Sequence, residues 1–161
     1  MTPAPGRRQT GSMDAPPGGL TLEIEAALAA PPDQVFRWVT EPELLARWWG
    51  PHGFTTPEID LDLRVGGHYR LTMQPPDGAA FHLAGEFLEI EPPERLAYTF
   101  RWEEPVPDDR ETVVVLGLRS AGDSTRLSLL QDGFATEERV DLHRSGWTDS
   151  LVKLGELLAQ P

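Results

Sequence analysis

Apolar and polar positions alternate along most of the chain from Leu20 onward, and this period of two is typical of half-buried β-strands. The first such segment has its apolar positions at Leu20, Leu22, Ile24 and Ala26. Segments with the same period follow at residues 58–65, 69–73, 80–91, 96–102, 112–119 and 125–131. Turn-forming residues separate several of them, at Pro75–Gly78, Pro92–Pro93 and Ala121–Asp123. The pattern predicts a meander of consecutive antiparallel strands.

Three segments follow the helical period instead. Pro32 and Asp33 favour the start of one short helix, because Pro suits the first turn and Asp suits its positive end. A second short helix has four apolar residues at helical spacing, Leu44, Leu45, Trp48 and Trp49. The last segment, residues 137–159, predicts a long helix with one stripe formed by Val140, His143, Trp147, Leu151, Leu154 and Leu158.

Gly146 lies inside this long helix, where Gly is about 1 kcal/mol less favourable than Ala. We therefore expect another element to pack close to the backbone at this position. The helix can cover only one face of the meander, so the sheet must curl around it. The order of elements predicts an α+β domain: a curved antiparallel sheet of six to seven strands, two short helices after the first strand, and a long C-terminal helix.

The composition limits the domain organisation and the partners. Residues 1–19 are rich in Pro and Gly and are expected to be a disordered tail, which leaves residues 20–161 as a single domain. Met1 and Met13 both remain possible native starts. The 161 residues contain 14 basic and 26 acidic side chains, for a net charge of −12, and no cysteine. This charge argues against nucleic acid and against an anionic membrane surface.

No apolar run approaches the roughly 20 residues of a membrane span, and no apolar stretch follows Arg7–Arg8 as a secretion signal requires. We therefore expect a cytoplasmic protein, either a monomer or a homodimer. A basic protein partner stays possible because of the acidic charge.

Several short motifs occur in a fixed order along the chain. They are Ala30–Phe36, Leu45–Pro51, Asp62–Gly67, Pro76–Gly78, Gly85, Pro92–Leu96, Thr125–Leu127 and His143–Trp147. This ordered set covers about residues 20–158 and resembles the START-like, or helix-grip, superfamily, which includes polyketide cyclases and the major birch-pollen allergen. More narrowly, the chain is similar to the branch named after the activator of the heat-shock-protein ATPase. The resemblance implies a seven-stranded sheet that grips the C-terminal helix around an internal cavity, and it implies no single activity.

The residues expected to line that cavity are mostly aromatic. They are Trp48, Trp49, Phe54, Tyr69, Met73, Phe87, Tyr98, Phe100, Trp102, His143, Trp147 and Leu151. A few polar groups, such as His143, Tyr98 and Arg101, would orient a ligand, and one of the adjacent tryptophans could gate the mouth. The purely structural alternative makes the stripe plain core and His143 a satisfied buried histidine. A slip of one residue in strand register would exchange the inward and outward sets.

Three functions remain open at this point. The first is the binding or sequestration of a small hydrophobic, aromatic or lipid-like molecule. The second is a cyclase or dehydratase in which His143 is the general acid or base. The third is a chaperone-regulating domain that binds another protein.

Other kinds of site lack support in the sequence. Asp60 and Asp62 alternate with apolar residues, so they are expected on a solvated face and not as a catalytic pair. The histidines at positions 52, 68, 82 and 143 lie on separate elements without ligand spacing, so we expect no metal site. We expect no cofactor, because the sequence has neither a phosphate loop nor a dinucleotide fingerprint.

Overall fold

A computed structural model describes residues 19–160 of the protein, and the predicted N-terminal tail lies outside these residues except for Gly19. The strands are β1 (Leu20–Leu28), β2 (Thr55–Leu61), β3 (His68–Gln74), β4 (Phe81–Glu91), β5 (Arg95–Trp102), β6 (Thr112–Ala121) and β7 (Ser124–Phe134). The helices are α1 (Pro32–Thr40), α2 (Pro42–Leu45) and α3 (Glu137–Leu158). The strands form one antiparallel sheet in the order β1-β7-β6-β5-β4-β3-β2. The predicted α+β architecture is confirmed.

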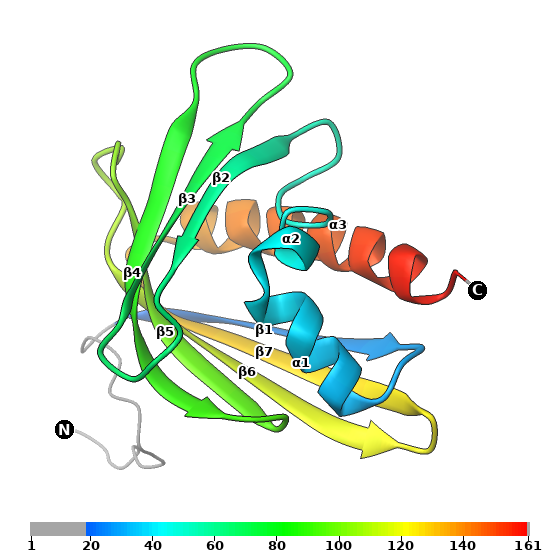
Figure 1. Ribbon diagram of the computed structural model, residues 1–161. Coiled ribbons are helices and arrows are strands. Elements are labelled where there is room, and N and C mark those ends of the chain that lie inside the picture. Colours follow the sequence, from blue (N-terminus) through cyan, green and yellow to red (C-terminus); the bar gives the residue numbers. More distant parts are fainter. Residues whose placement is uncertain (1–18, 161) are drawn as a thin grey trace, which may run out of the picture.

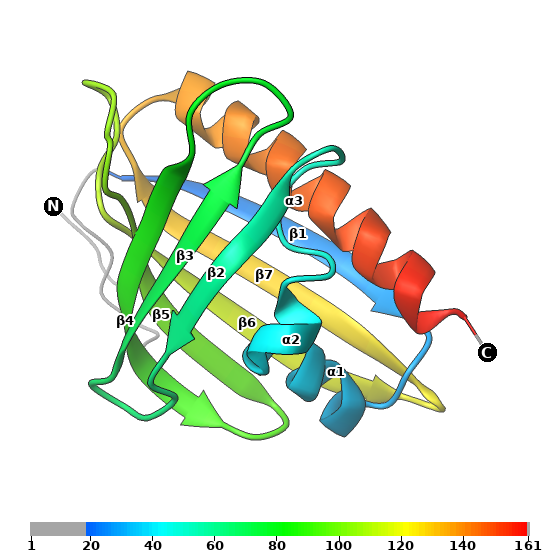
Figure 2. The same cartoon turned by 45° about the horizontal axis from the view of Figure 1, so that its top comes forward.

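The sheet is strongly curved, and α3 runs along β1 and β7 on its inner side (Figure 1). The half of the sheet that contains β2, β3 and β4 bends around toward α3, as the tilted view makes clear (Figure 2). Helix α1 packs against β6 and β7, and α2 packs against β2. The sheet, α3 and the two short helices therefore enclose an interior on several sides. None of the described helices is long and apolar enough to cross a membrane.

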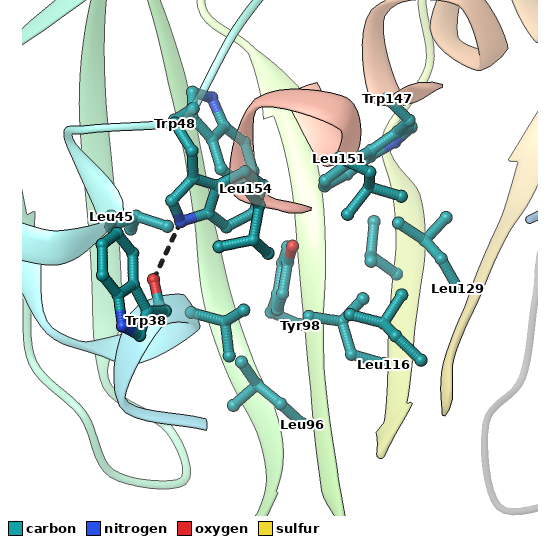
Figure 3. Close-up of a cluster of buried hydrophobic side chains, with 14 of the residues drawn as sticks. Trp38, Leu45, Trp48, Leu96, Tyr98, Leu116, Leu129, Trp147, Leu151 and Leu154 are labelled. Atoms are coloured by element: carbon teal, nitrogen blue, oxygen red, sulfur yellow. Dashed lines mark hydrogen bonds between the residues drawn. The ribbon is translucent and has the colours of Figure 1, made fainter. Parts of the chain in front are cut away.

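The part of the interior beneath α1 and α2 is solidly packed (Figure 3). Trp48 is 1% exposed, and its indole N–H donates a hydrogen bond of 2.9 Å to the carbonyl oxygen of Trp38. Leu96 from β5 and Leu154 from α3 are buried in the same cluster. A void in this region, beside Tyr98, measures about 20 Å³, which is room for a single water molecule. This half of the interior is therefore a conventional close-packed core.

Helix α3 carries the predicted stripe on its inner face. Val140, Trp147, Leu151, Leu154 and Leu158 are all buried. The helix begins at a capped end, where the Thr136 hydroxyl accepts a hydrogen bond of 3.2 Å from the backbone N–H of Arg139. The expectation of close packing at Gly146 is wrong. Apart from the adjacent residues and the backbone of the same helix, no atom lies within 4 Å of where a Cβ would stand.

Two element boundaries differ from the sequence prediction. The alternation that extends to Val65 predicts a longer strand, but β2 ends at Leu61, and Leu63 and Val65 are 43% and 62% exposed. Residues 62–67 form a loop that is joined to β4 by backbone hydrogen bonds between Gly66, Gly67 and Phe87, and Gly66 adopts a φ of +86° there. The second short helix ends at Leu45, so Trp48 and Trp49 lie in the turns that follow it.

Candidate functional site

A cavity of about 420 Å³ lies between the first half of α3 and the inner face of β3, β4 and β5. The loop after α2 and the loop after β5 complete its wall. Its apolar lining is mostly aromatic and consists of Trp49, Phe54, Met73, Phe81, Phe100, Trp102 and Trp147. Gly146 also lines it, and apart from its chain neighbours and the backbone of its own helix, no atom lies within 4 Å of where a Cβ would stand there. A side chain at position 146 would therefore have open space around it.

The aromatic side chains hold one another in place around the cavity. The ring centroids of Trp49 and Trp147 are 5.1 Å apart in an edge-to-face arrangement. Phe100 and Trp102 make a second edge-to-face pair at 5.2 Å, and Phe81 lies 5.3 Å from Trp102. Such pairs add about 0.5–1.5 kcal/mol each beyond the burial of their area. The wall is thus preorganised by contacts between strands, α3 and the turn after α2.

A buried chain of hydrogen bonds fixes the orientation of Trp147. Its indole N–H donates to the Gln131 side-chain oxygen at 2.7 Å, and the Gln131 amide donates to the Thr112 hydroxyl at 2.8 Å. Gln131 is 0% exposed, although it stands in the inward phase of an otherwise apolar strand. A buried polar side chain of this kind is stable only when its hydrogen bonds are satisfied. Gln131 therefore sets the position of the largest side chain that α3 contributes to the cavity.

Both ring nitrogens of His143 have partners. Because a carbonyl can only accept, Nδ1 carries the proton that is donated to the Arg139 carbonyl oxygen at 2.8 Å. Nε2 accepts a hydrogen bond of 3.1 Å from the indole N–H of Trp102. Burial lowers the pKa of His143, and the hydrogen bond to Arg139 opposes this effect only in part. These contacts fix His143 as a neutral imidazole whose lone pair is already used.

Charged pairs surround the mouth of the cavity. Asp109, in the loop after β5, forms an ion pair of 2.6 Å with Arg139 at the start of α3, and their side chains are only 9% and 17% exposed. Farther along α3, Asp149 accepts hydrogen bonds from the backbone and the ring of His52. These bonds lower the pKa of the Asp149 carboxyl. Both pairs tie a loop to α3.

The pair Glu104–His82 and two exposed apolar side chains complete the mouth. Glu104 binds the backbone N–H and the ring of His82 at 2.8 and 2.6 Å, and these bonds lower the pKa of its carboxyl. Val106 and Leu142 also line the cavity and remain 48% and 55% exposed. The cavity therefore reaches the surface between two exposed apolar side chains.

The structure separates the predicted cavity residues into two groups. Those that line the cavity are Trp49, Phe54, Met73, Phe100, Trp102, His143 and Trp147. Those that belong to the solid core instead are Trp48, Tyr69, Phe87, Tyr98 and Leu151. Burial raises the pKa values of Tyr69 and Tyr98, and the Tyr69 hydroxyl donates to the Thr99 carbonyl oxygen at 2.6 Å. Arg101 lies in the outward phase of β5 and lines a groove of the outer face, so it does not reach the cavity.

Sequence reasoning missed Gln131, Asp109 and Arg139 as parts of the site. Gln131 had a detectable sign, because it occupies an apolar position of the alternating pattern that includes Leu127 and Leu129. The Asp109–Arg139 pair joins residues 30 positions apart across a loop and a hairpin, and no local pattern relates them.

One cluster of possible metal ligands also escaped the sequence analysis. His82, Glu103 and Glu104 each place a ligand atom within 4.8 Å of the others. Their atoms already have partners, since Arg70 donates two hydrogen bonds of 2.9 and 2.8 Å to Glu103, and Glu104 binds His82. The cluster is therefore explained by one ion pair, Arg70–Glu103, and one hydrogen-bonded pair, His82–Glu104, which join β3, β4 and the loop after β5.

The curved sheet, the long C-terminal helix and the cavity between them define a helix-grip protein. Residues 29–159 match the family described as Activator of Hsp90 ATPase homolog 1-like protein, and the chain belongs to this family. The family assignment confirms the resemblance seen in the sequence. No protein matches in the comparison with curated proteins.

Similar solved structures come from several bacteria. Protein CV1439 from Chromobacterium violaceum is 29% identical, with a TM-score of 0.81 over 88% of this chain and 98% of that one. Protein NE0264 from Nitrosomonas europaea is 32% identical, with a TM-score of 0.73 over 86% and 94%. The AHSA1 protein from Silicibacter pomeroyi is 30% identical, with a TM-score of 0.75 over 87% and 98%. These proteins share the architecture described above across almost their whole length.

Proposed function

We propose that the protein binds a small apolar or aromatic molecule in the cavity between the sheet and α3. The observation that carries the proposal is the uneven packing of the interior. Folded interiors contain few voids larger than a water molecule, and the core beneath α1 and α2 follows that rule with a void of about 20 Å³. The cavity beside it has about 420 Å³, within the usual range of ligand pockets.

The chemistry of the wall supports an apolar occupant. The lining consists mostly of aromatic rings and Met73, with charged groups from Glu104, Asp109, Arg139 and Asp149. Burial of apolar ligand surface would supply the driving force, at about 25 cal/mol per Å². A carrier or a sequestering protein needs no more than such a site.

The geometry of His143 favours binding over acid–base catalysis. A general base needs a free lone pair within reach of the substrate, but Nε2 accepts the Trp102 N–H and Nδ1 donates to Arg139. A cyclase or dehydratase would first have to break one of these bonds. The family name points to a chaperone partner, and such a role would use the outer surface instead of the cavity.

Substitution of Gly146 tests the proposal, because this position faces the open space. In Gly146→Leu the new side chain enters the cavity, while the matched control Gly146→Ala adds one methyl group that meets no atom within 4 Å. The probe is N-phenyl-1-naphthylamine, which fluoresces in apolar sites. We expect wild type and Gly146→Ala to bind it and Gly146→Leu to bind at least about tenfold more weakly, a difference of about 1.4 kcal/mol.

Both substitutions should leave the protein folded, because Ala and Leu are better helix formers than Gly by up to about 1 kcal/mol. Equal affinity in Gly146→Leu would show that the probe binds elsewhere. No binding by folded wild type would refute the proposed function. If the probe binds, native mass spectrometry of the purified protein would identify a natural occupant, because a bound ligand appears as extra mass that is lost on denaturation.

A further inference from the structure

We infer that the cavity selects its ligand by charge: it takes an aromatic molecule that carries a positive charge in preference to a neutral one, and it rejects anions. This inference rests on the proposed binding function and adds the chemical class of the ligand. It depends on which charged groups line the cavity and on which of them are already neutralised.

Three carboxylates line the cavity. Glu104 and Asp109 belong to the loop after β5, and Asp149 belongs to α3. Hydrogen bonds from His52 and His82 lower the pKa values of Asp149 and Glu104, so both carboxyl groups are ionised at neutral pH. The protein as a whole carries a net charge of −12. An approaching anion therefore meets like charge both at long range and at the mouth.

The lining offers no counter-ion for an anionic ligand. Arg139 is the one Lys or Arg among the described residues that line the cavity; its Nη2 is paired with Asp109 at 2.6 Å, and its Nε is buried without a partner. His143 is held neutral by its two hydrogen bonds. Lys153 does not line the cavity, although its ammonium lies 3.4 Å from the carbonyl oxygen of Pro51, which does, and its charge helps to lower the pKa of Asp149.

Two of the indole donors of the wall are also engaged. The indole N–H of Trp102 is used by His143, and that of Trp147 is used by Gln131. What the wall presents is the faces and edges of aromatic rings, which attract cations through their quadrupole. A carboxylate or sulfonate placed against these ring faces would lose its hydration, which is unfavourable. Among the described residues, the buried side-chain donor left without a partner is Nε of Arg139, whose charge is already balanced by Asp109.

The test uses three naphthalene derivatives of nearly equal shape: 2-naphthyltrimethylammonium, 2-tert-butylnaphthalene and naphthalene-2-sulfonate. Their affinities are measured by displacement of N-phenyl-1-naphthylamine from wild-type protein at about 0.15 M salt, where long-range charge effects are screened. We expect the cation to bind roughly fivefold or more tightly than the tert-butyl compound. The sulfonate is expected to bind more weakly than both.

The outcomes separate this inference from the binding function. Equal affinities, or tightest binding of the sulfonate, would leave the binding function in place and overturn the charge selection. No binding of any probe would overturn both.

A pair of variants assigns the selection to the mouth. Glu104→Gln and Glu94→Gln each remove one negative charge, but Glu94 is an exposed residue beside a groove on the outer face, remote from the cavity lining. We expect Glu104→Gln to reduce the ratio of cation to neutral affinity at least about twofold and Glu94→Gln to leave it unchanged. An equal ratio of cation to neutral affinity in both variants would show that the charge at the mouth does not select the ligand.

Discussion

Replacement of Gln131 by Leu tests the buried hydrogen-bond chain behind the cavity wall. Leu has a similar volume and suits the apolar surroundings, so the change removes hydrogen bonds without leaving a large hole. The Trp147 N–H then loses its acceptor while Trp147 stays buried, at 6% exposure, and Thr112 loses the amide that donates to it. A buried donor left without a partner costs about 1–3 kcal/mol.

The expected net loss is about 2 kcal/mol, because the apolar Leu recovers part of the penalty. For a chain of this size that loss lowers Tm by about 4–8 °C. Urea denaturation followed by tryptophan fluorescence and far-UV circular dichroism measures the change in the free energy of unfolding. The matched control is Gln34→Leu, because Gln34 is exposed on α1, and its replacement should change stability by less than about 0.5 kcal/mol.

A double-mutant cycle with Trp147→Phe isolates the hydrogen bond. Phe keeps an aromatic ring but has no N–H, so the double variant leaves neither partner of that bond unsatisfied. We expect the two changes to be less destabilising together than the sum of the single changes, by about 1 kcal/mol. Strictly additive values, or a Gln131→Leu variant as stable as wild type, would refute the view that this bond holds Trp147 in place.

Two further predictions concern charge. Because burial lowers the His143 pKa, the unfolded chain takes up a proton below about pH 6.5 that the folded protein does not, so acid destabilises the fold by up to about 1.4 kcal/mol per pH unit. Urea titrations between pH 7.5 and 5.5 should show a steeper loss of unfolding free energy for wild type than for His143→Gln. Equal slopes would contradict this prediction. Asp109→Asn and Arg139→Gln should each lower the free energy of unfolding by about 3 kcal/mol in the same assay, because each single change leaves a mostly buried charge unpaired. The double variant should lose less than the sum of the two single losses. Additive losses would show that the two side chains do not stabilise each other.

Hydrophobic periodicity predicted the elements of this fold well, because each strand and α3 bury one face. The period of two in β3 and β5 and the stripe on α3 report directly on the inner face of the sheet. The alternation failed at Leu63 and Val65, where the two glycines that follow turn the chain into a loop before the pattern ends. A period shows which side chains can share a face, but it does not show where the ladder of strand hydrogen bonds stops.

The division between cavity and core could not be predicted in the same way. Tyr98 and Phe100 occupy equivalent inward positions of β5, two residues apart. Yet Tyr98 lies under the packed helices α1 and α2, and Phe100 faces open space beside Gly146. That difference depends on the curvature of the sheet and on where the two short helices sit, and both are set by contacts between residues distant in the chain.

One half of the interior is close-packed and the other contains the cavity, and this difference affects which substitutions the fold tolerates. Substitutions in the solid half, at residues such as Trp48 or Leu154, disturb close packing and are expected to cost several kcal/mol of stability, on the order of 2–5 for a large-to-small change. Substitutions at Phe54 or Phe81 alter a wall that already borders empty space, so their effect on stability is smaller. The shape and chemistry of the cavity can therefore change by substitution at its wall while the packed core stays constant.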